Sequence, residues 1–192
     1  MMPSQKGKCI IVSAPSGAGK TTIVHALLKE IPILSFSISA CSRDPRSNES
    51  EGKDYYFVGV DGFKKLIQEE AFIEWEEVYK NNFYGTLKKE IARIWSNNQV
   101  VVFDVDVMGG LRLKEIFNNQ ALSVFVKPPS ISELEKRLLS RNTESQDKIE
   151  MRISKAKFEL TKAQLFDVCI VNENIDAAVN QAKHEVLNFL QA

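Results

Sequence analysis

A short loop near the N-terminus combines small residues, a lysine and two threonines in a spacing that suits phosphate binding. Gly19, Lys20 and Thr21 stand between an apolar run at residues 8–13 and a stretch of helical periodicity that Pro32 ends. In that context backbone N–H groups and the helix N-terminus converge on phosphate oxygens, the lysine reaches the terminal phosphates, and the threonine hydroxyl ligates Mg²⁺. We therefore expect a nucleotide phosphate site with Lys20 as a catalytic cation. The expected site comprises Ala14, Pro15, Ser16, Gly17, Ala18, Gly19, Lys20, Thr21 and Thr22.

The loop departs from the usual G-x-x-x-x-G-K-[ST] pattern at its first position, which is Ala14 here. A methyl group is tolerated there as long as the residue does not need a positive φ. The alternative interpretation is an ordinary glycine-containing turn between a strand and a helix.

Two aspartates follow a second apolar run, at residues 100–103. Asp104 and Asp106 would then stand at the end of a strand, where enzymes with this loop hold the acidic partner of Mg²⁺. Strands often end in aspartate, so this signal is weak by itself. We expect Thr21 and Asp104 to be the metal ligands.

A third group of candidates has two arginines three positions apart. Arg43 and Arg46 flank Pro45, and Tyr55 follows. Two guanidinium groups on a stiffened turn can clamp one phosphate, and a tyrosine hydroxyl can donate to the same group. Without further evidence, a solvated loop with two surface arginines is the more common explanation.

The elements that must position these residues alternate along the chain. Apolar runs at residues 8–13, 100–103, 121–126 and 166–171 are separated by stretches with helical periodicity. This alternation predicts an α/β fold, with a parallel sheet covered by helices on both faces. Ser130 and Asn174 are the expected starts of two of the helices.

A polar and then aromatic region, from about residue 37 to residue 84, interrupts that alternation. Strands are expected at 55–58 and 72–78, around a short helix capped by Asp61. We therefore expect a small mixed β/α insertion in the parallel fold. A second polar patch, at residues 140–148, predicts a loop between two helices.

The composition limits the partners of the chain. Its 192 residues carry 25 basic and 25 acidic side chains and a net charge of +0, which argues against binding nucleic acid or membranes through bulk charge. No apolar run is long enough to span a bilayer. Cys9, Cys41 and Cys169 are odd in number and widely spaced, which favours a cytoplasmic protein, and Cys9 and Cys169 are expected to be buried.

The arginine region resembles the signature of guanylate kinases, T-[ST]-R-x-x-[KR]-x-x-[DE]-x-x-G-x-x-Y-x-F. Residues 41–57 agree at every specified position except the first, where Cys41 replaces threonine. Further motifs similar to the family's follow in order. They are Phe72-Ile73-Glu74-Trp75, Tyr84-Gly85-Thr86, Asp104-Val105-Asp106, Pro128-Pro129-Ser130, Arg137-Leu138 and Ile170-Val171-Asn172. Met108 and Asn142 depart from the family pattern.

The resemblance implies a nucleoside monophosphate kinase fold that takes ATP, Mg²⁺ and GMP or dGMP. Residues 1–36 and 87–192 would form the P-loop core, residues 37–86 the GMP-binding insertion, and about residues 137–152 a helical lid. Relatives include monomers and homodimers. The implied substrate site comprises Ser39, Arg43, Arg46, Tyr55, Glu74, Tyr84, Gly85, Thr86 and Asp106, and Asn172 joins the ATP site.

Glu74 suits the guanine edge in this implied site. A carboxylate can accept two parallel hydrogen bonds from N1–H and N2–H₂ of guanine, and adenine lacks that pair of donors. A buried Glu74 would be left unpaired by adenine, which predicts selection of GMP.

Three arginines surround the implied lid. Arg137, Arg141 and Arg152, together with Arg43, would stabilise the negative charge of two phosphorylated substrates in the transition state. The alternative is a helix surface with ordinary i,i+4 pairs, because Glu133 precedes Arg137 by four positions.

Two other functions remain open at this point. Guanylate-kinase-like domains of scaffold proteins bind protein partners without turnover, but they generally have a degraded phosphate loop, whereas Gly19, Lys20 and Thr21 are intact here. A related P-loop kinase could use another phosphorylated acceptor, although Glu74 with Thr86 favours GMP.

Overall fold

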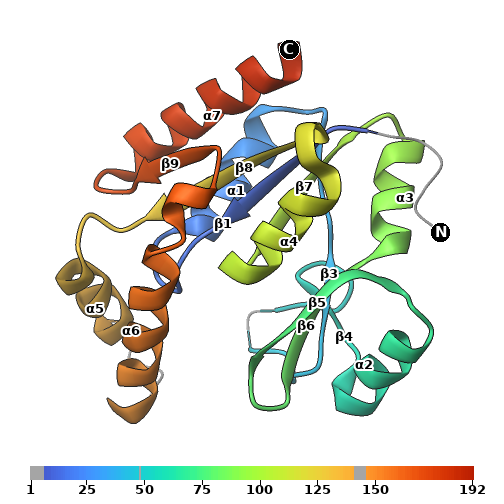
Figure 1. The fold of residues 1–192 in the computed structure, drawn as a ribbon, viewed down its shortest axis with the longest axis horizontal. Coiled ribbons are helices and arrows are strands. Elements are labelled where there is room, and N and C mark those ends of the chain that lie inside the picture. The colour runs from blue at the N-terminus through green and yellow to red at the C-terminus, as the bar shows by residue number, and fades with distance from the viewer. Residues whose placement is uncertain (1–6, 48, 141–145) are drawn as a thin grey trace.

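The computed structural model describes residues 7–47, 49–140 and 146–192, and its centre is a five-stranded sheet (Figure 1). The order β2-β7-β1-β8-β9 puts the strand before the glycine-rich loop in the middle, and every neighbouring pair is parallel. The strands are β1 (Cys9–Ser13), β2 (Leu34–Phe36), β7 (Val100–Val105), β8 (Ala121–Lys127) and β9 (Val168–Val171). The α/β fold expected from the sequence is therefore confirmed.

Helices cover both faces of this sheet because β1 is apolar on both sides. Ile10 and Val12 pack against α1 (Lys20–Glu30) and α7 (Ile175–Gln191) on one face. On the other face Cys9 and Ile11 belong to a buried apolar cluster with residues of two other helices, α3 (Lys88–Ser96) and α4 (Val107–Phe117).

The polar and aromatic region forms a second sheet of mixed direction. Its order is β4-β3-β6-β5, with β3 and β4 parallel and the other pairs antiparallel. Its elements are β3 (Ser39–Cys41), β4 (Tyr55–Phe57), α2 (Gly59–Gln68), β5 (Phe72–Tyr79) and β6 (Asn82–Leu87). Phe63 of α2 stacks on Phe72 and Phe83, at ring-centroid distances of 4.5 and 5.5 Å, and so gives this unit its own small core.

Two helices project from the other side of the core (Figure 1). They are α5 (Ile131–Ser140) and α6 (Gln146–Leu160), which pack together through Leu134, Leu138 and Ala156. Ser130 caps α5 as expected, since its Oγ accepts a hydrogen bond from the Glu133 amide at 3.0 Å. Short 3₁₀ turns, η1 (Asn118–Gln120) and η2 (Ala163–Leu165), precede β8 and β9.

Some local expectations were wrong. Asp61 lies in the first turn of α2, and the residue before the helix is Val58, so Asp61 is not the cap. Cys169 is exposed, because β9 is an edge strand, while Cys9 is buried as expected. Among the described residues no helix has the length and apolar character needed to cross a membrane.

Candidate active site

A pocket of about 300 Å³ lies between the loop after β1, the end of β7, the mixed sheet and helix α6. Most of the side chains singled out from the sequence line it, although they come from segments far apart in the chain. The lining includes Ala14, Pro15, Ser16, Gly17, Gly19, Lys20, Thr21, Thr22, Ser39, Arg43, Arg46, Tyr55, Glu74, Tyr84, Gly85, Asp104, Asp106 and Arg152. The fold thus brings the expected triphosphate loop and the expected acceptor residues to one cavity.

The glycine-rich loop has the backbone geometry that a phosphate cradle requires. Gly17 and Gly19 have φ values of 92° and 93°, a region that side-chain-bearing residues rarely adopt. Ala14 is not among the residues with positive φ, so its methyl group is tolerated as expected. Lys20 begins α1, and the helix N-terminus therefore faces the pocket.

Asn172 contacts the glycine-rich loop from the protein interior and does not line the pocket. Its side chain is buried, and Nδ2 donates to the Ala18 carbonyl at 2.8 Å. A Cβ at Gly19 would come within 2.2 Å of the same Nδ2 atom. Ala18 is fully buried, so Ala18 and Asn172 shape the loop from inside the protein.

Asp104 joins the loop to the end of β7. Its carboxylate accepts a hydrogen bond from Lys20 Nζ, and its Oδ2 lies 3.3 Å from the Thr21 hydroxyl. Lys20 also donates to the Val105 carbonyl at 3.0 Å. The pocket-facing oxygens of Thr21 and Asp104 are thus adjacent, which fits a small hard cation that takes its other ligands from water and phosphate.

Arg43 is held in place by acidic and aromatic neighbours. Its guanidinium forms two hydrogen bonds to the Glu49 carboxylate, at 2.6 and 2.8 Å, and Nε donates to the Tyr84 hydroxyl at 3.0 Å. The guanidinium carbon lies 5.1 Å from the centre of the Tyr55 ring. The hydrogen bond from Arg43 lowers the pKa of Glu49 below its ordinary value. Sequence reasoning gave Glu49 no role, although it occupies the acidic position of the family signature.

Arg46 is the more exposed of the two arginines. Its amide donates to Glu49 Oε2 at 2.9 Å, and its guanidinium lies 3.7 Å from the same carboxylate. Glu49 therefore orients both expected clamp residues.

Glu74 also lines the pocket, with only 8% of its surface exposed. Thr86 is buried behind it and donates to Oε1 at 2.7 Å. Burial raises the pKa of Glu74 to about 7, although the Thr86 hydrogen bond opposes the rise. A Cβ at Gly109 would lie 2.9 Å from Glu74 Oε2 and 3.1 Å from Asp106 Oδ1, so these two carboxylates approach the same turn of α4.

Helix α6 contributes the expected Arg152 and two further residues, Lys155 and Glu159, that were not expected from the sequence. Arg152 donates to the Ser16 hydroxyl at 2.8 Å, which links α6 to the phosphate loop. Lys155 and Glu159 line the pocket one and two turns further along, and Glu76 and Tyr79 line it from β5. A lysine and a glutamate four apart on a helix are typical of a solvated face, so only their position in the fold reveals them.

Arg137, one of the expected lid arginines, is not among the described residues that line the pocket. Arg137 lies on α5, where Nε donates to Glu133 at 3.1 Å and NH2 donates to the Asn172 carbonyl at 3.2 Å. Arg141 lies outside the described residues, as does Asn142.

Comparisons with known protein families, sequences and structures all match this chain to guanylate kinases. The family model described as "Guanylate kinase" matches residues 6–188. A curated guanylate kinase of Bacteroides thetaiotaomicron is 47% identical over 184 residues, which cover 96% of this chain and 90% of the relative. A curated guanylate kinase of Porphyromonas gingivalis is 44% identical over 184 residues, with 95% and 98% covered. The crystal structure of guanylate kinase from Anaplasma phagocytophilum superimposes with a TM-score of 0.78 at 29% identity, covering 95% of this chain and 85% of that chain.

Proposed function

The chain belongs to the guanylate kinase family of ATP:GMP phosphotransferases, and we propose that its pocket transfers the γ-phosphoryl group of ATP to GMP, giving ADP and GDP. The observation that carries the proposal is one cavity lined both by an intact phosphate loop and by the buried carboxylate of Glu74. A protein-binding module would need neither feature.

ATP occupies the end of the pocket formed by the glycine-rich loop. The loop amides and the N-terminus of α1 bind its phosphate oxygens, and Lys20 contacts the β- and γ-phosphates. In the absence of substrate Asp104 and the Val105 carbonyl hold the Lys20 ammonium group, so the cation is already in the pocket. Arg152 adds positive charge beside Ser16.

The Thr21 hydroxyl and the Asp104 carboxylate, whose oxygens are adjacent, would hold Mg²⁺. The bound ion would supply charge neutralisation at the nucleotide phosphates. Among the residues that the structure describes, no three His, Cys, Asp or Glu side chains are grouped to hold a metal. A site with few protein ligands is typical of Mg²⁺ that is shared with a nucleotide.

GMP occupies the other end of the pocket. Arg43, Arg46 and Tyr84 bind its phosphate, and the hydrogen bonds that Arg43 donates to Glu49 and Tyr84 orient its guanidinium before GMP arrives. Ser39, Tyr55, Gly85 and Asp106 line the same end of the cavity.

Glu74 accepts the hydrogen bonds of guanine N1–H and N2–H₂, with Thr86 orienting its carboxylate from behind. Once both nucleotides are aligned, in-line positioning and positive charge around the transferring phosphoryl group lower the barrier, and no covalent intermediate is needed.

We also propose a division of labour along the chain. Residues 1–36 and 87–192 form the kinase core, residues 37–86 the GMP-binding insertion, and about residues 137–152 the lid. Closure of this lid over both substrates brings the positive charge of Arg137 and Arg141 to the phosphates and excludes water from the reaction. The separate core of the insertion, built on Phe63, supports its movement as a unit. The thiols of Cys9, Cys41 and Cys169 are free, which suits a cytoplasmic location.

Replacement of Lys20 by alanine tests the proposal. Lys20→Ala should lower kcat for GMP phosphorylation by about 100-fold or more, because the lysine contacts the transferring phosphate, while the melting temperature changes little. Lys29→Ala is the matched control, since Lys29 is an exposed lysine of the same helix. Wild-type turnover in Lys20→Ala, measured by coupled ADP release, would refute the assignment of the phosphate loop.

A further inference from the structure

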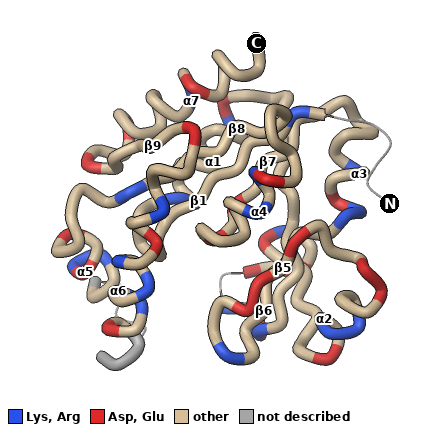
Figure 2. The backbone as a smooth tube through the Cα atoms, in the orientation of Figure 1, with Lys and Arg blue, Asp and Glu red and all other residues tan. Residues whose placement is uncertain are grey.

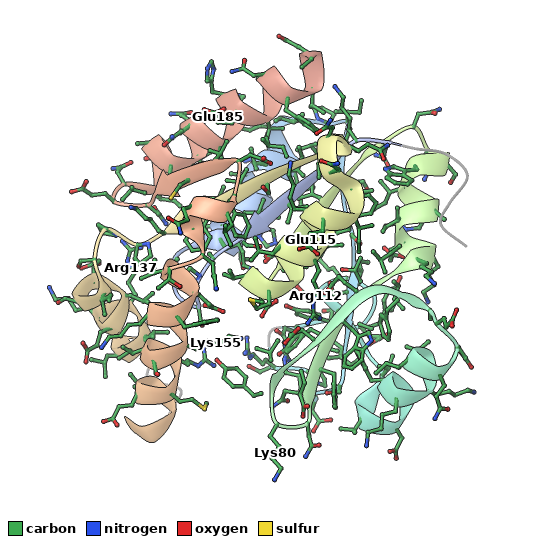
Figure 3. All side chains as sticks on the ribbon, in the orientation of Figure 1. Lys80, Arg112, Glu115, Arg137, Lys155 and Glu185 are labelled. Carbon is green, nitrogen blue, oxygen red and sulfur yellow. The ribbon has the colours of Figure 1, made fainter. Side chains whose placement is uncertain are left out.

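Lys155 is the pocket-lining cation for which the proposed mechanism has no use. It extends from α6 into the space between that helix and the β5–β6 hairpin (Figure 3). Its Nζ lies 3.5 Å from Asp106 Oδ2 and 3.6 Å from Glu159 Oε1. About a quarter of the lysine side chain is exposed, so the ammonium group is partly shielded from water.

A third contact fixes where this ammonium group lies. Nζ stands 5.1 Å from the centre of the Tyr79 ring, which belongs to β5. Lys155 therefore touches three elements that surround the acceptor end of the pocket: its own helix through Glu159, the start of α4 through Asp106, and the hairpin through Tyr79. A long side chain restrained from three directions has few rotamers available to it, so its charge has a defined position.

One carboxylate oxygen of Asp106 caps helix α4, and the other faces Lys155. Oδ1 accepts from the Gly109 amide at 2.9 Å, because Asp106 is the N-cap of α4. Oδ2 is the atom that approaches Lys155. The cap fixes the plane of the carboxylate only in part, and the lysine supplies the second restraint.

Asp106 also lies close to a second carboxylate. Glu74 and Asp106 approach Gly109 from two sides, and Asp106 contributes to the raised pKa of Glu74. Two negative charges at one end of a pocket repel each other, and a neighbouring cation lowers that cost. Among the described residues Lys155 is the lysine that contacts Asp106, so its positive charge offsets part of the repulsion between the two carboxylates.

We propose that Lys155 is a positioning residue for the acceptor nucleotide, which acts by holding the Asp106 carboxylate beside Glu74 in the orientation that GMP requires. This inference rests on the proposed function, because it assumes that GMP binds at that end of the pocket. Lys155 thus contributes to GMP binding, whereas Lys20 and Arg152 contribute to ATP binding.

Lys155→Met is the first test, because methionine keeps the length and apolar stem of lysine and removes the charge. The dissociation constant of GMP, measured by calorimetry without ATP, and KM for GMP should each rise about five- to tenfold, the scale of a partly shielded charged contact. KM for ATP should stay within about twofold of the wild-type value. Lys155→Arg should restore most of the GMP affinity.

Lys157→Met is the matched control, since Lys157 is exposed on the same helix and does not line the pocket. It should change neither constant. Equal changes in the constants for GMP and ATP in Lys155→Met, or no change in either, would overturn the proposal.

A double-mutant cycle tests whether Lys155 acts through Asp106. In an Asp106→Asn background the further change Lys155→Met should alter GMP affinity less than about twofold, because the charge that it positions has already been removed. Fully additive effects would overturn the positioning role.

The same binding measurements distinguish this inference from the proposed function. If the wild-type protein and Lys155→Met bind GMP equally well, only this inference is contradicted. If the wild-type protein binds no GMP, the proposed function is contradicted.

Discussion

Glu74 is a carboxylate that the fold holds almost entirely out of water, and its environment sets both its charge and its selectivity. Burial raises its pKa to about 7, so a small change in pH alters its protonation. The ionised form offers two acceptors to guanine, whereas the protonated form turns one oxygen into a donor. In the proposed function, recognition of the guanine base therefore depends on a carboxyl group whose charge changes near neutral pH.

This environment predicts a pH dependence for GMP. Because we propose that the ionised form of Glu74 binds guanine, and its pKa is about 7, kcat/KM for GMP should fall about tenfold as pH is lowered from 8 to 6. The measurement is a pH profile of kcat/KM for GMP in the wild type and in Glu74→Gln. The variant should be lower at pH 8 and flatter between the two pH values.

The comparison with Glu74→Gln isolates this residue from two other groups. The phosphate of GMP and the buried Glu159, whose pKa is also raised to about 7 by burial, titrate in both proteins. Parallel profiles in the wild type and in the variant would show that Glu74 does not read the base.

At the scale of elements, the site depends on where strands and helices end. The loop after β1, Asp104 at the end of β7 and Asn172 just after β9 meet because the carboxyl ends of parallel strands share one edge of the sheet. Asn172 then ties β9 to the phosphate loop through the Ala18 carbonyl.

Asn172→Ala should weaken ATP binding more than GMP binding. The change leaves the buried Ala18 carbonyl without its donor, which costs about 1–3 kcal/mol, and frees the loop that binds phosphate. We expect KM for ATP to rise several-fold and KM for GMP to stay within about twofold.

Asn174→Ala serves as the stability control for that change. It removes the N-cap of α7, at a cost of about 1 kcal/mol, and does not touch the loop. If both variants raise KM for ATP equally, the effect is one of general stability and Asn172 has no specific role.

The same scale explains what the sequence could and could not predict. The loop at Lys20 was predictable because its signal is contiguous and its flanking strand is apolar throughout. β2 and β3 were not anticipated, because three residues such as Ser39–Cys41 are too short for a periodic pattern. Lys155 and Glu159 were missed because their spacing on α6 is also that of a solvated helix surface. Their role depends on which element faces that helix, which is a tertiary property.

At the scale of the whole molecule, the net charge of +0 arises from basic and acidic side chains that occupy distinct positions around the pocket. Among the described residues, five basic and five acidic side chains line the pocket, so this part of the site is as balanced in charge as the chain. Figure 2 shows basic positions on α6 opposite acidic positions on β5. Lys20 and Arg152 lie at the phosphate loop, and Arg43 and Arg46 lie around Glu49. Glu74 marks the proposed site of the base. The balance allows the protein to hold two anionic nucleotides without a surface that attracts polyanions in general.

The central claim is that this pocket phosphorylates GMP and rejects other nucleoside monophosphates. The most direct measurement is ATP-dependent turnover of GMP, dGMP, AMP, UMP and CMP under identical conditions with Mg²⁺, followed by ADP release. We expect turnover with GMP and dGMP, and kcat/KM for AMP at least about 1000-fold lower than for GMP, because adenine leaves Glu74 unpaired. Equal turnover of AMP and GMP, or no turnover of any of the five, would contradict the claim.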